Sequence, residues 1–175
     1  MRIIKEGSYA MILPDKVFEA SKRKEEKNYK FRSFLKAHAD EKELDEQFLR
    51  LHNELFKDYD CSKCRNCCKV CHAQIPESDI EKDAEFLNMT AEKFKEEYLI
   101  RDEFGELVTK HMPCDFLDVN GECRLGDCKP ESCKKYPFTN QPERLWSLLG
   151  LIESVSVCPV AYEICERLKQ EYHFR

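Results

Sequence analysis

Apolar residues in the first third of the chain recur at the spacing of an amphipathic helix. Asp40 and Glu43 stand three residues apart at the start of this segment, as in a capping box, with Asp40 as the N-cap and Glu43 reaching back to it. The sequence therefore predicts a helix that begins after Asp40 and buries one stripe of side chains, formed by Leu44, Phe48, Leu51 and Leu55.

Other segments carry helix signals of the same kind. A helix is expected over about residues 15–37, although its middle is almost wholly polar. Ser78 and Glu81 form a second capping box ahead of a short helix, and Thr90 caps the segment that follows. A last helix is predicted over about residues 159–172, because proline suits the first turn of a helix.

Strand signals are few. The segment GELVTK at 105–110 is a strand candidate. Asn120-Gly121 lies between two apolar stretches, and this pair favours a tight hairpin because a type I′ turn needs positive φ at both central residues. The pattern as a whole predicts an α+β fold that is mostly helical with a small β-hairpin region.

The chain has 175 residues, of which 42% are hydrophobic and 36% charged. This length suits one compact unit, divided here into a helical segment, residues 1–57, packed on a cysteine-rich domain, residues 58–175. A net charge of −5 gives no electrostatic footprint for nucleic acid. The first residues are charged and lack the apolar run of a signal peptide, and no apolar run approaches the roughly 18 residues that span a bilayer. We expect a cytoplasmic protein that binds neither nucleic acid nor membrane.

Cysteine changes this picture of an ordinary helical protein. The chain has 11 cysteines, all between positions 61 and 165 and none in the first 60 residues. In a reducing compartment so many thiols indicate metal binding or redox chemistry, and an odd count does not fit a framework of disulfides. The expected fold is therefore organised around a cysteine-ligated metal centre.

The first cysteine block, residues 61–71, reads CSKCRNCCKVC. Its two-residue gaps allow successive thiolates to turn back onto one ion or cluster. Cys61, Cys64, Cys67 and Cys71 reproduce the C-x2-C-x2-C-x3-C run of bacterial ferredoxins, with His72 where that run has proline. Cys67 and Cys68 are adjacent, and side chains of adjacent residues in extended or turn backbone point to different sides. The pair therefore favours a polynuclear cluster, or two nearby sites, over one mononuclear ion.

The second cysteine group is more widely spaced. Cys114 and Cys123 flank the predicted hairpin, which would bring them close together. Cys128 is a secondary candidate ligand, as is Cys71. Cys165 is expected to be a buried small hydrophobe in the last helix. The aromatic residues of this half either shield a metal centre from water or simply form the core; they are Phe116, Tyr136, Phe138 and Trp146.

These motifs resemble the YkgJ-type cysteine-cluster family, which shares its cysteine block with flagellin lysine-N-methylases. The resemblance covers roughly residues 58–160 and consists of C-x2-C-x2-C-C at 61–68, PCDFL at 113–117, GEC at 121–123, KPESCKKYPF at 129–138 and Cys-Pro at 158–159. It implies a domain that chelates zinc or iron through eight cysteines, namely Cys61, Cys64, Cys67, Cys68, Cys114, Cys123, Cys133 and Cys158. Two features depart from the family pattern: Lys129 stands where an arginine is usual, and an aromatic residue usual near Gly126 is missing.

Three functions follow as expectations. In the preferred one the cysteines hold an iron–sulfur cluster, with zinc as the alternative cofactor, and the centre transfers electrons, senses redox state or organises the fold, in contact with a protein partner for redox chemistry or assembly. In the second the chain is a methylase that depends on S-adenosylmethionine, although the sequence has no glycine-rich loop for that cofactor and no C-x3-C-x2-C motif. In the third it is a structural zinc module for protein–protein interaction.

Overall fold

The computed structural model describes residues 11–175. The first ten residues, which carry most of the charged start that argued against a signal peptide, lie outside the described residues. Among residues 11–175, no helix combines the length and the apolar character needed to cross a bilayer.

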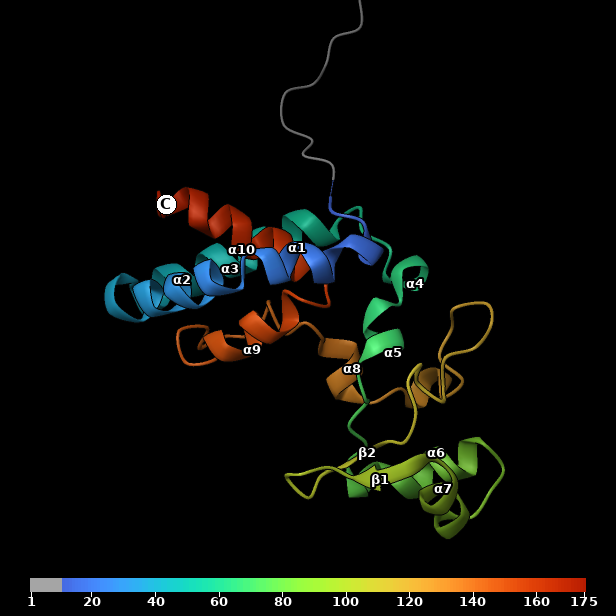
Figure 1. The fold of residues 1–175 in the computed structure, drawn as a ribbon. Helices are drawn as coiled ribbons and strands as arrows, with labels where there is room; N and C mark the ends of the chain where they lie inside the picture. Colours follow the sequence, from blue (N-terminus) through green and yellow to red (C-terminus); the bar gives the residue numbers. More distant parts are fainter. Residues whose placement is uncertain (1–10) are drawn as a thin grey trace, which may run out of the picture. The chain divides into compact units, whose positions relative to one another are not determined.

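The described chain folds into two compact units (Figure 1). The helical unit consists of residues 11–58 and 139–175, and the cysteine unit consists of residues 59–138. Most residues are helical, and the two β-strands form one antiparallel pair, which confirms the predicted α+β fold class. The predicted division after residue 57 stays a prediction, because contacts within each unit do not tell which segments fold on their own.

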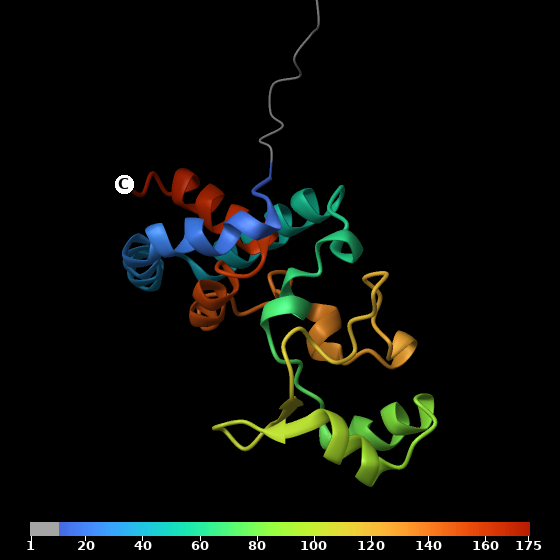
Figure 2. The same ribbon diagram turned by 45° about the vertical axis from the view of Figure 1, so that its right-hand side comes forward.

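The helical unit has five α-helices in its described part. They are α1 (Val17–Arg23), α2 (Glu25–His38), α3 (Glu41–Phe56), α9 (Leu148–Ser154) and α10 (Pro159–Glu171). The short 3-10 helix η1 (Pro14–Lys16) precedes α1. Helix α3 packs against α10, and α2 packs against α9 (Figures 1 and 2). The predicted apolar stripe of α3 is confirmed, because all four of its residues are buried.

The predicted start of α3 is also confirmed. The Asp40 side chain accepts a hydrogen bond from the backbone N–H of Glu43 at 3.0 Å. This bond satisfies one of the four N–H groups that a helix leaves unpaired at its first turn.

The helix predicted over residues 15–37 is interrupted at Lys24. Its first part, α1, packs against α10, whereas its second part, α2, packs against α9. The Lys24 ammonium itself forms an ion pair with Glu166 of α10 at 2.6 Å. Tertiary packing therefore overrides a helical propensity that is continuous in the sequence.

The chain returns to the helical unit next to the helix from which it left. The Thr139 hydroxyl lies 2.9 Å from Nδ1 of His52 on α3. The two carboxylate oxygens of Asp45, also on α3, accept hydrogen bonds from the backbone N–H groups of Glu143 and Arg144 at 2.9 and 2.8 Å. The segment after residue 138 is thus fixed to α3.

The cysteine unit is built from short elements. They are α4 (Cys61–Cys64), α5 (Asn66–Val70), η2 (Glu77–Asp79), α6 (Ile80–Phe86), α7 (Ala91–Tyr98), β1 (Leu99–Arg101), β2 (Leu107–Thr109), η3 (Gly126–Cys128) and α8 (Glu131–Lys135). An apolar cluster forms its core with eight buried residues: Ile75, Ile80, Ala84, Phe94, Leu99, Leu107, Phe116 and Leu125. None of the eight lies in the cysteine-bearing helices α4, α5 and α8, which have no buried residue.

The predicted caps of this unit had different outcomes. Thr90 caps α7 as predicted, because its hydroxyl accepts from the N–H of Lys93 at 3.3 Å. The prediction at Ser78 was wrong: this residue lies inside η2, its hydroxyl donates to Asp79, and α6 starts at Ile80 without a side-chain cap. A turn of 3-10 helix takes the place of the capping box.

Both predicted β features exist in part. Strand β2 confirms the strand candidate at 105–110, and its partner β1 pairs with it in register, Leu99 opposite Thr109. Residues 73–75 pair with β2 on its other side, through hydrogen bonds of 2.9 Å from Ile75 to Leu107 and from Thr109 to Ala73. At Asn120-Gly121 the chain does reverse, but only one antiparallel bridge, Leu117 with Cys123, flanks the turn.

Candidate metal site

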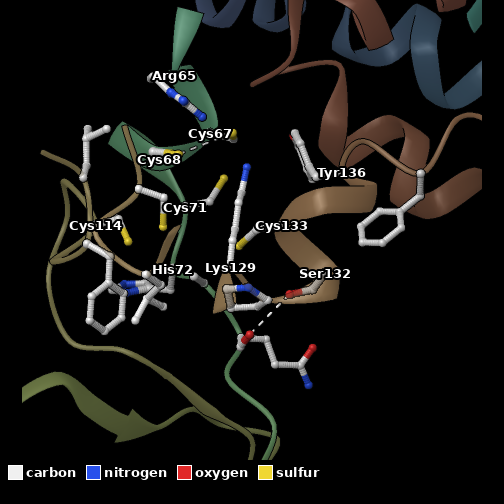
Figure 3. Close-up of a pocket in the computed structure, with 18 residues that line it drawn as sticks. Arg65, Cys67, Cys68, Cys71, His72, Cys114, Lys129, Ser132, Cys133 and Tyr136 are labelled. Carbon is white, nitrogen blue, oxygen red and sulfur yellow. Dashed lines mark hydrogen bonds between the residues drawn. The ribbon is translucent and has the colours of Figure 1, made fainter. Parts of the chain in front are cut away.

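A cavity of about 230 Å³ lies within the cysteine unit (Figure 3). Six cysteines line it, and they come from four separate segments of the chain: Cys67, Cys68, Cys71, Cys114, Cys123 and Cys133. The remaining wall is mostly apolar, with Phe116, Leu125 and Pro130 among its residues. The fold therefore gathers sulfur atoms that are up to 66 residues apart in the sequence around one space.

The first cysteine block forms two short helices joined by a left-handed residue. Asp60 caps α4 by accepting from the N–H of Ser62 at 2.9 Å. Arg65 then adopts φ 50° and ψ 21°, a conformation that costs a residue with a Cβ about 1 kcal/mol or more, and α5 begins after it. This sharp turn allows the chain to bring two helical cysteine pairs together within ten residues.

Cys67 and Cys68 remain close together in this arrangement. Their sulfur atoms lie 4.0 Å apart, so the divergence expected of adjacent side chains does not occur. The expectation assumed extended or turn backbone, but both residues lie in α5, where successive side chains are only about 100° apart around the axis. Both sulfurs line the same cavity and are available to the same centre.

Hydrogen bonds hold the cysteine segments around the cavity. The backbone N–H of Cys114 donates to the carbonyl of Cys68 at 2.7 Å, which joins the segment after β2 to α5. The Ser132 hydroxyl donates to the carbonyl of Gln74 at 3.2 Å, which joins α8, and with it Cys133, to the segment after α5 (Figure 3). These bonds connect groups that are remote in sequence.

The turn that carries Cys123 also depends on a close approach. Gly121 has φ +83°, and a Cβ placed on it would lie 3.0 Å from the backbone carbonyl oxygen of Ser62 in α4. Only glycine combines this backbone conformation with this proximity. The predicted turn thus has a second role, which is to dock against the first cysteine block.

Gly126, where the family pattern usually has an aromatic residue nearby, is covered by an aromatic ring from elsewhere. A Cβ on Gly126 would lie 2.9 Å from the ring of Phe86 in α6. Phe86 therefore packs on the glycine and occupies part of the space around η3.

Burial dominates the acidity of the thiols. It raises the pKa of Cys114 to about 11, and it raises the pKa of Cys61, Cys71, Cys123 and Cys133 as well. Cys68 is the exception: a hydrogen bond from Cys67 lowers its pKa to about 6, and the positive charges of Lys129 and Arg65 act in the same direction. Metal ligation requires thiolates, so binding at this site releases protons and weakens as the solution is acidified.

The structure does not bring all of the predicted ligands to the cavity. Cys61 and Cys64 lie on α4, next to it but not among its lining residues, and Cys128 packs against the apolar core of the unit. Cys158 is buried at the start of α10 in the helical unit, and its predicted role as a ligand stays a prediction. Cys165 is buried in α10, as expected of a small hydrophobe. Cys71, a secondary candidate, does line the cavity.

The aromatic residues divide between the two units. Phe116 is fully buried and lines the cavity, together with Tyr136 and Phe138. Trp146 belongs to the helical unit and is 70% exposed; its indole N–H donates to Glu41 at 2.9 Å. Trp146 is therefore neither a core residue nor part of the cavity wall.

His72 is a lining residue that spacing alone did not single out. Its Nδ1 lies 2.6 Å from the backbone carbonyl oxygen of Thr109, which can only accept. Nδ1 therefore carries the proton, and in the neutral ring Nε2 keeps its lone pair. Metal-binding histidines are commonly held in this way. A sequence signal existed, because His72 occupies the proline position of the ferredoxin run.

The chemistry of the lining fits a soft metal. Thiolates favour zinc and iron–sulfur clusters, and apolar walls limit the access of water to such a centre. In residues 11–175 no three side chains of His, Cys, Asp or Glu converge closely enough to coordinate one ion, although six cysteines line the cavity. The site is thus a cysteine-lined cavity of the metal-binding class.

Comparison with family models agrees with this class. Residues 60–150, just over half of the chain, match the CxxCxxCC model, described as a "putative zinc- or iron-chelating domain". The chain belongs to this family, which confirms the resemblance found in the sequence. The matched residues include every cavity-lining cysteine. Neither the search of curated proteins nor the search of solved structures found a match.

Proposed function

We propose that the cysteine unit holds an iron–sulfur cluster in its cavity and that the protein transfers electrons to, or senses redox state with, a protein partner. The observation that carries this proposal is that six cysteines line one cavity of about 230 Å³. A structural zinc ion takes four ligands at Zn–S distances of about 2.3 Å around one point. A cluster is larger, is held by cysteine thiolates, and suits sulfurs that are spaced around a volume.

Five cysteines are common to the family pattern and to the cavity, and these are the proposed ligand set: Cys67, Cys68, Cys114, Cys123 and Cys133. Cys71 and His72 line the same cavity and are alternative ligands. When bound, a cluster would supply one-electron redox chemistry. The chain's own residues would exclude water from it, chiefly the apolar side chains of Phe116, Leu125 and Pro130.

Anaerobic purification tests the proposal. The expected protein is brown and contains iron and acid-labile sulfide. Colourless protein with stoichiometric zinc would contradict the cluster and support a structural zinc site. Protein that contains neither iron nor zinc would contradict both assignments.

A further inference from the structure

Two positively charged side chains line the cavity without a partner. Among residues 11–175, neither Arg65 nor Lys129 has a carboxylate within ion-pair distance or a side-chain hydrogen bond, and Nε of Arg65 is buried without a partner. Other basic residues of the same unit do have acidic partners: Lys95 and Arg101 pair with Glu77 at 2.9 and 3.0 Å. Both residues are half-buried, and a cationic group that is partly withdrawn from water is stabilised by a compensating negative charge.

The two cations approach the sulfurs from different sides. Arg65 is the left-handed residue between α4 and α5, and its guanidinium points toward Cys67 and Cys68 (Figure 3). Lys129 lies just before α8 and extends into the cavity beside Cys133 (Figure 3). Neither side chain is held by a neighbouring carboxylate in the part of the chain that the structure describes.

Lys129 lines the cavity together with cysteines of both blocks. Cys67, Cys68 and Cys71 come from the first block, and Cys114, Cys123 and Cys133 come from the second. One lysine therefore faces cysteines from both halves of the sequence motif.

We propose that Lys129 and Arg65 are the counter-charges of the thiolate centre and determine how firmly its metal is retained. The inference rests on the proposed metal site but not on the identity of the metal. Four thiolates around either Zn²⁺ or a cluster with two positive core charges leave two net negative charges. Two cations in the cavity wall neutralise these charges beside mostly apolar side chains, where Coulomb interactions are stronger than in bulk water.

The test uses the metal-loaded full chain and measures the rate at which metal passes to an excess of chelator. Lys129→Gln and Arg65→Gln each remove one charge and should release metal on the order of tenfold faster than the wild type. Lys129→Arg keeps the charge and should release metal at nearly the wild-type rate. Lys93→Gln, which removes a charge from an exposed residue of α7, is the matched control and should have no effect.

Salt distinguishes charge from packing. The difference between Lys129→Gln and wild type should shrink between about 0.01 M and about 1 M salt, because added ions screen the interaction. The inference would be overturned if Lys129→Gln released metal at the wild-type rate. It would also be overturned if Lys129→Arg released metal as fast as Lys129→Gln. If Lys129→Gln is purified without metal, the metal content of purified Lys129→Arg is compared with that of the wild type. Full metal content supports the role of the charge, and an equal loss of metal overturns the inference. Failure of the proposed function would instead appear as the wrong metal, or none, in the wild type.

Discussion

The thiols of this protein are distinguished by what surrounds them more than by their spacing. Cys133 lines the cavity, whereas Cys165 is 1% exposed in α10, where burial raises its pKa to about 11. Because Cys165 is buried in the helical unit and does not line the cavity, it behaves as a small apolar side chain.

This contrast predicts the outcome of cysteine replacement. Cys133→Ser and Cys67→Ser should lower metal content substantially, because serine is a poor ligand for soft metals. Cys165→Ser should leave metal content unchanged, at a cost of about 1 kcal/mol in stability from placing a hydroxyl in an apolar site. Metal analysis of the three purified variants measures this, and equal content in all three would contradict the assignment.

Asp83 presents a different residue-scale feature. Its side chain is fully buried on α6, and neither carboxylate oxygen has a hydrogen-bond partner among residues 11–175. Burial raises its pKa to about 6. The folded protein therefore binds this proton more tightly than the unfolded chain, so the group destabilises the fold increasingly as pH rises from about 4 through 6.

Asp83→Asn removes this charge while keeping the size of the side chain. The variant should be about 1–2 kcal/mol more stable near pH 8, with a clearly smaller gain near pH 5. Urea denaturation at both pH values measures the free energy of unfolding. Glu81→Gln, an exposed change on the same helix, is the control and should give no gain at either pH. A gain independent of pH would argue that burial does not shift this carboxyl group.

Residue chemistry could be predicted where it depends on neighbours in sequence. The family motif identified five of the six cysteines of the cavity. It gave no sign that Lys129 and Arg65 lack acidic partners, because a missing partner is a property of the folded surroundings. The close sulfurs of Cys67 and Cys68 were also missed, since they follow from helical backbone at α5.

At the scale of elements, two glycines with the same backbone conformation have different surroundings. Gly105, between β1 and β2, and Gly121, in the turn before Cys123, both have φ +83°. A Cβ at Gly105 would meet nothing within 4 Å, whereas one at Gly121 would meet the Ser62 carbonyl oxygen at 3.0 Å.

Gly121→Ala and Gly105→Ala therefore separate backbone strain from docking. Both should lose about 1 kcal/mol of stability because alanine disfavours positive φ. Only Gly121→Ala should also weaken metal retention, since it moves the turn away from α4. Metal transfer to a chelator compares them, and the same transfer rate in both variants would contradict a role for this contact.

We expect the short helices that carry cysteine to depend on metal more than their neighbours do. Helices α4, α5 and α8 have no buried residue, whereas α6 and α7 bury Ile80, Ala84 and Phe94. Removal of metal by chelator under reducing conditions should abolish hydrogen-exchange protection in α4, α5 and α8 and leave most of it in α6, α7 and β2. Full protection of all these elements in the apoprotein would mean that metal does not organise the segments.

Element prediction succeeded where the signal was local. Asp40 and Thr90 cap helices as expected, because an N-cap bond spans only three residues. The break at Lys24 was not predictable, since it reflects which distant helix each half packs against. Strand β1 was missed for a similar reason: it directly continues α7 and gains its strand character only by pairing with β2.

On the scale of the whole molecule, the helical unit is assembled from two segments of the chain, one before and one after the cysteine unit in the sequence. Residues 59–138 form an insertion of 80 residues between α3 and the segment that returns to it. Closing a flexible loop of that length costs about 4 kcal/mol. No local sequence pattern indicated that the chain returns to α3 after residue 138. The contacts that fix this segment, Thr139 with His52 and Arg144 with Asp45, arise only in the folded protein.

Metal removal should therefore lower the thermal stability of the helical unit as well as that of the cysteine unit. We expect α3 and α10 to persist in the apoprotein, since both bury continuous apolar stripes, but with a lower thermal midpoint than in the metal-loaded chain because the insertion becomes a flexible loop. Far-UV circular dichroism of both forms during heating measures this. An unchanged midpoint would show that the insertion is equally ordered without metal.

The return of the chain to α3 makes residues 59–138 an exchangeable module. His52 contacts Thr139, and the six steps along the chain from His52 to Asp58 span only about 9 Å at the rise of a helix. A short glycine–serine linker bridges such a gap. A lineage, or an engineer, can thus lose, duplicate or transplant the cysteine unit without redesigning the helices that carry it, and the same junction can accept a foreign domain whose two ends lie close together.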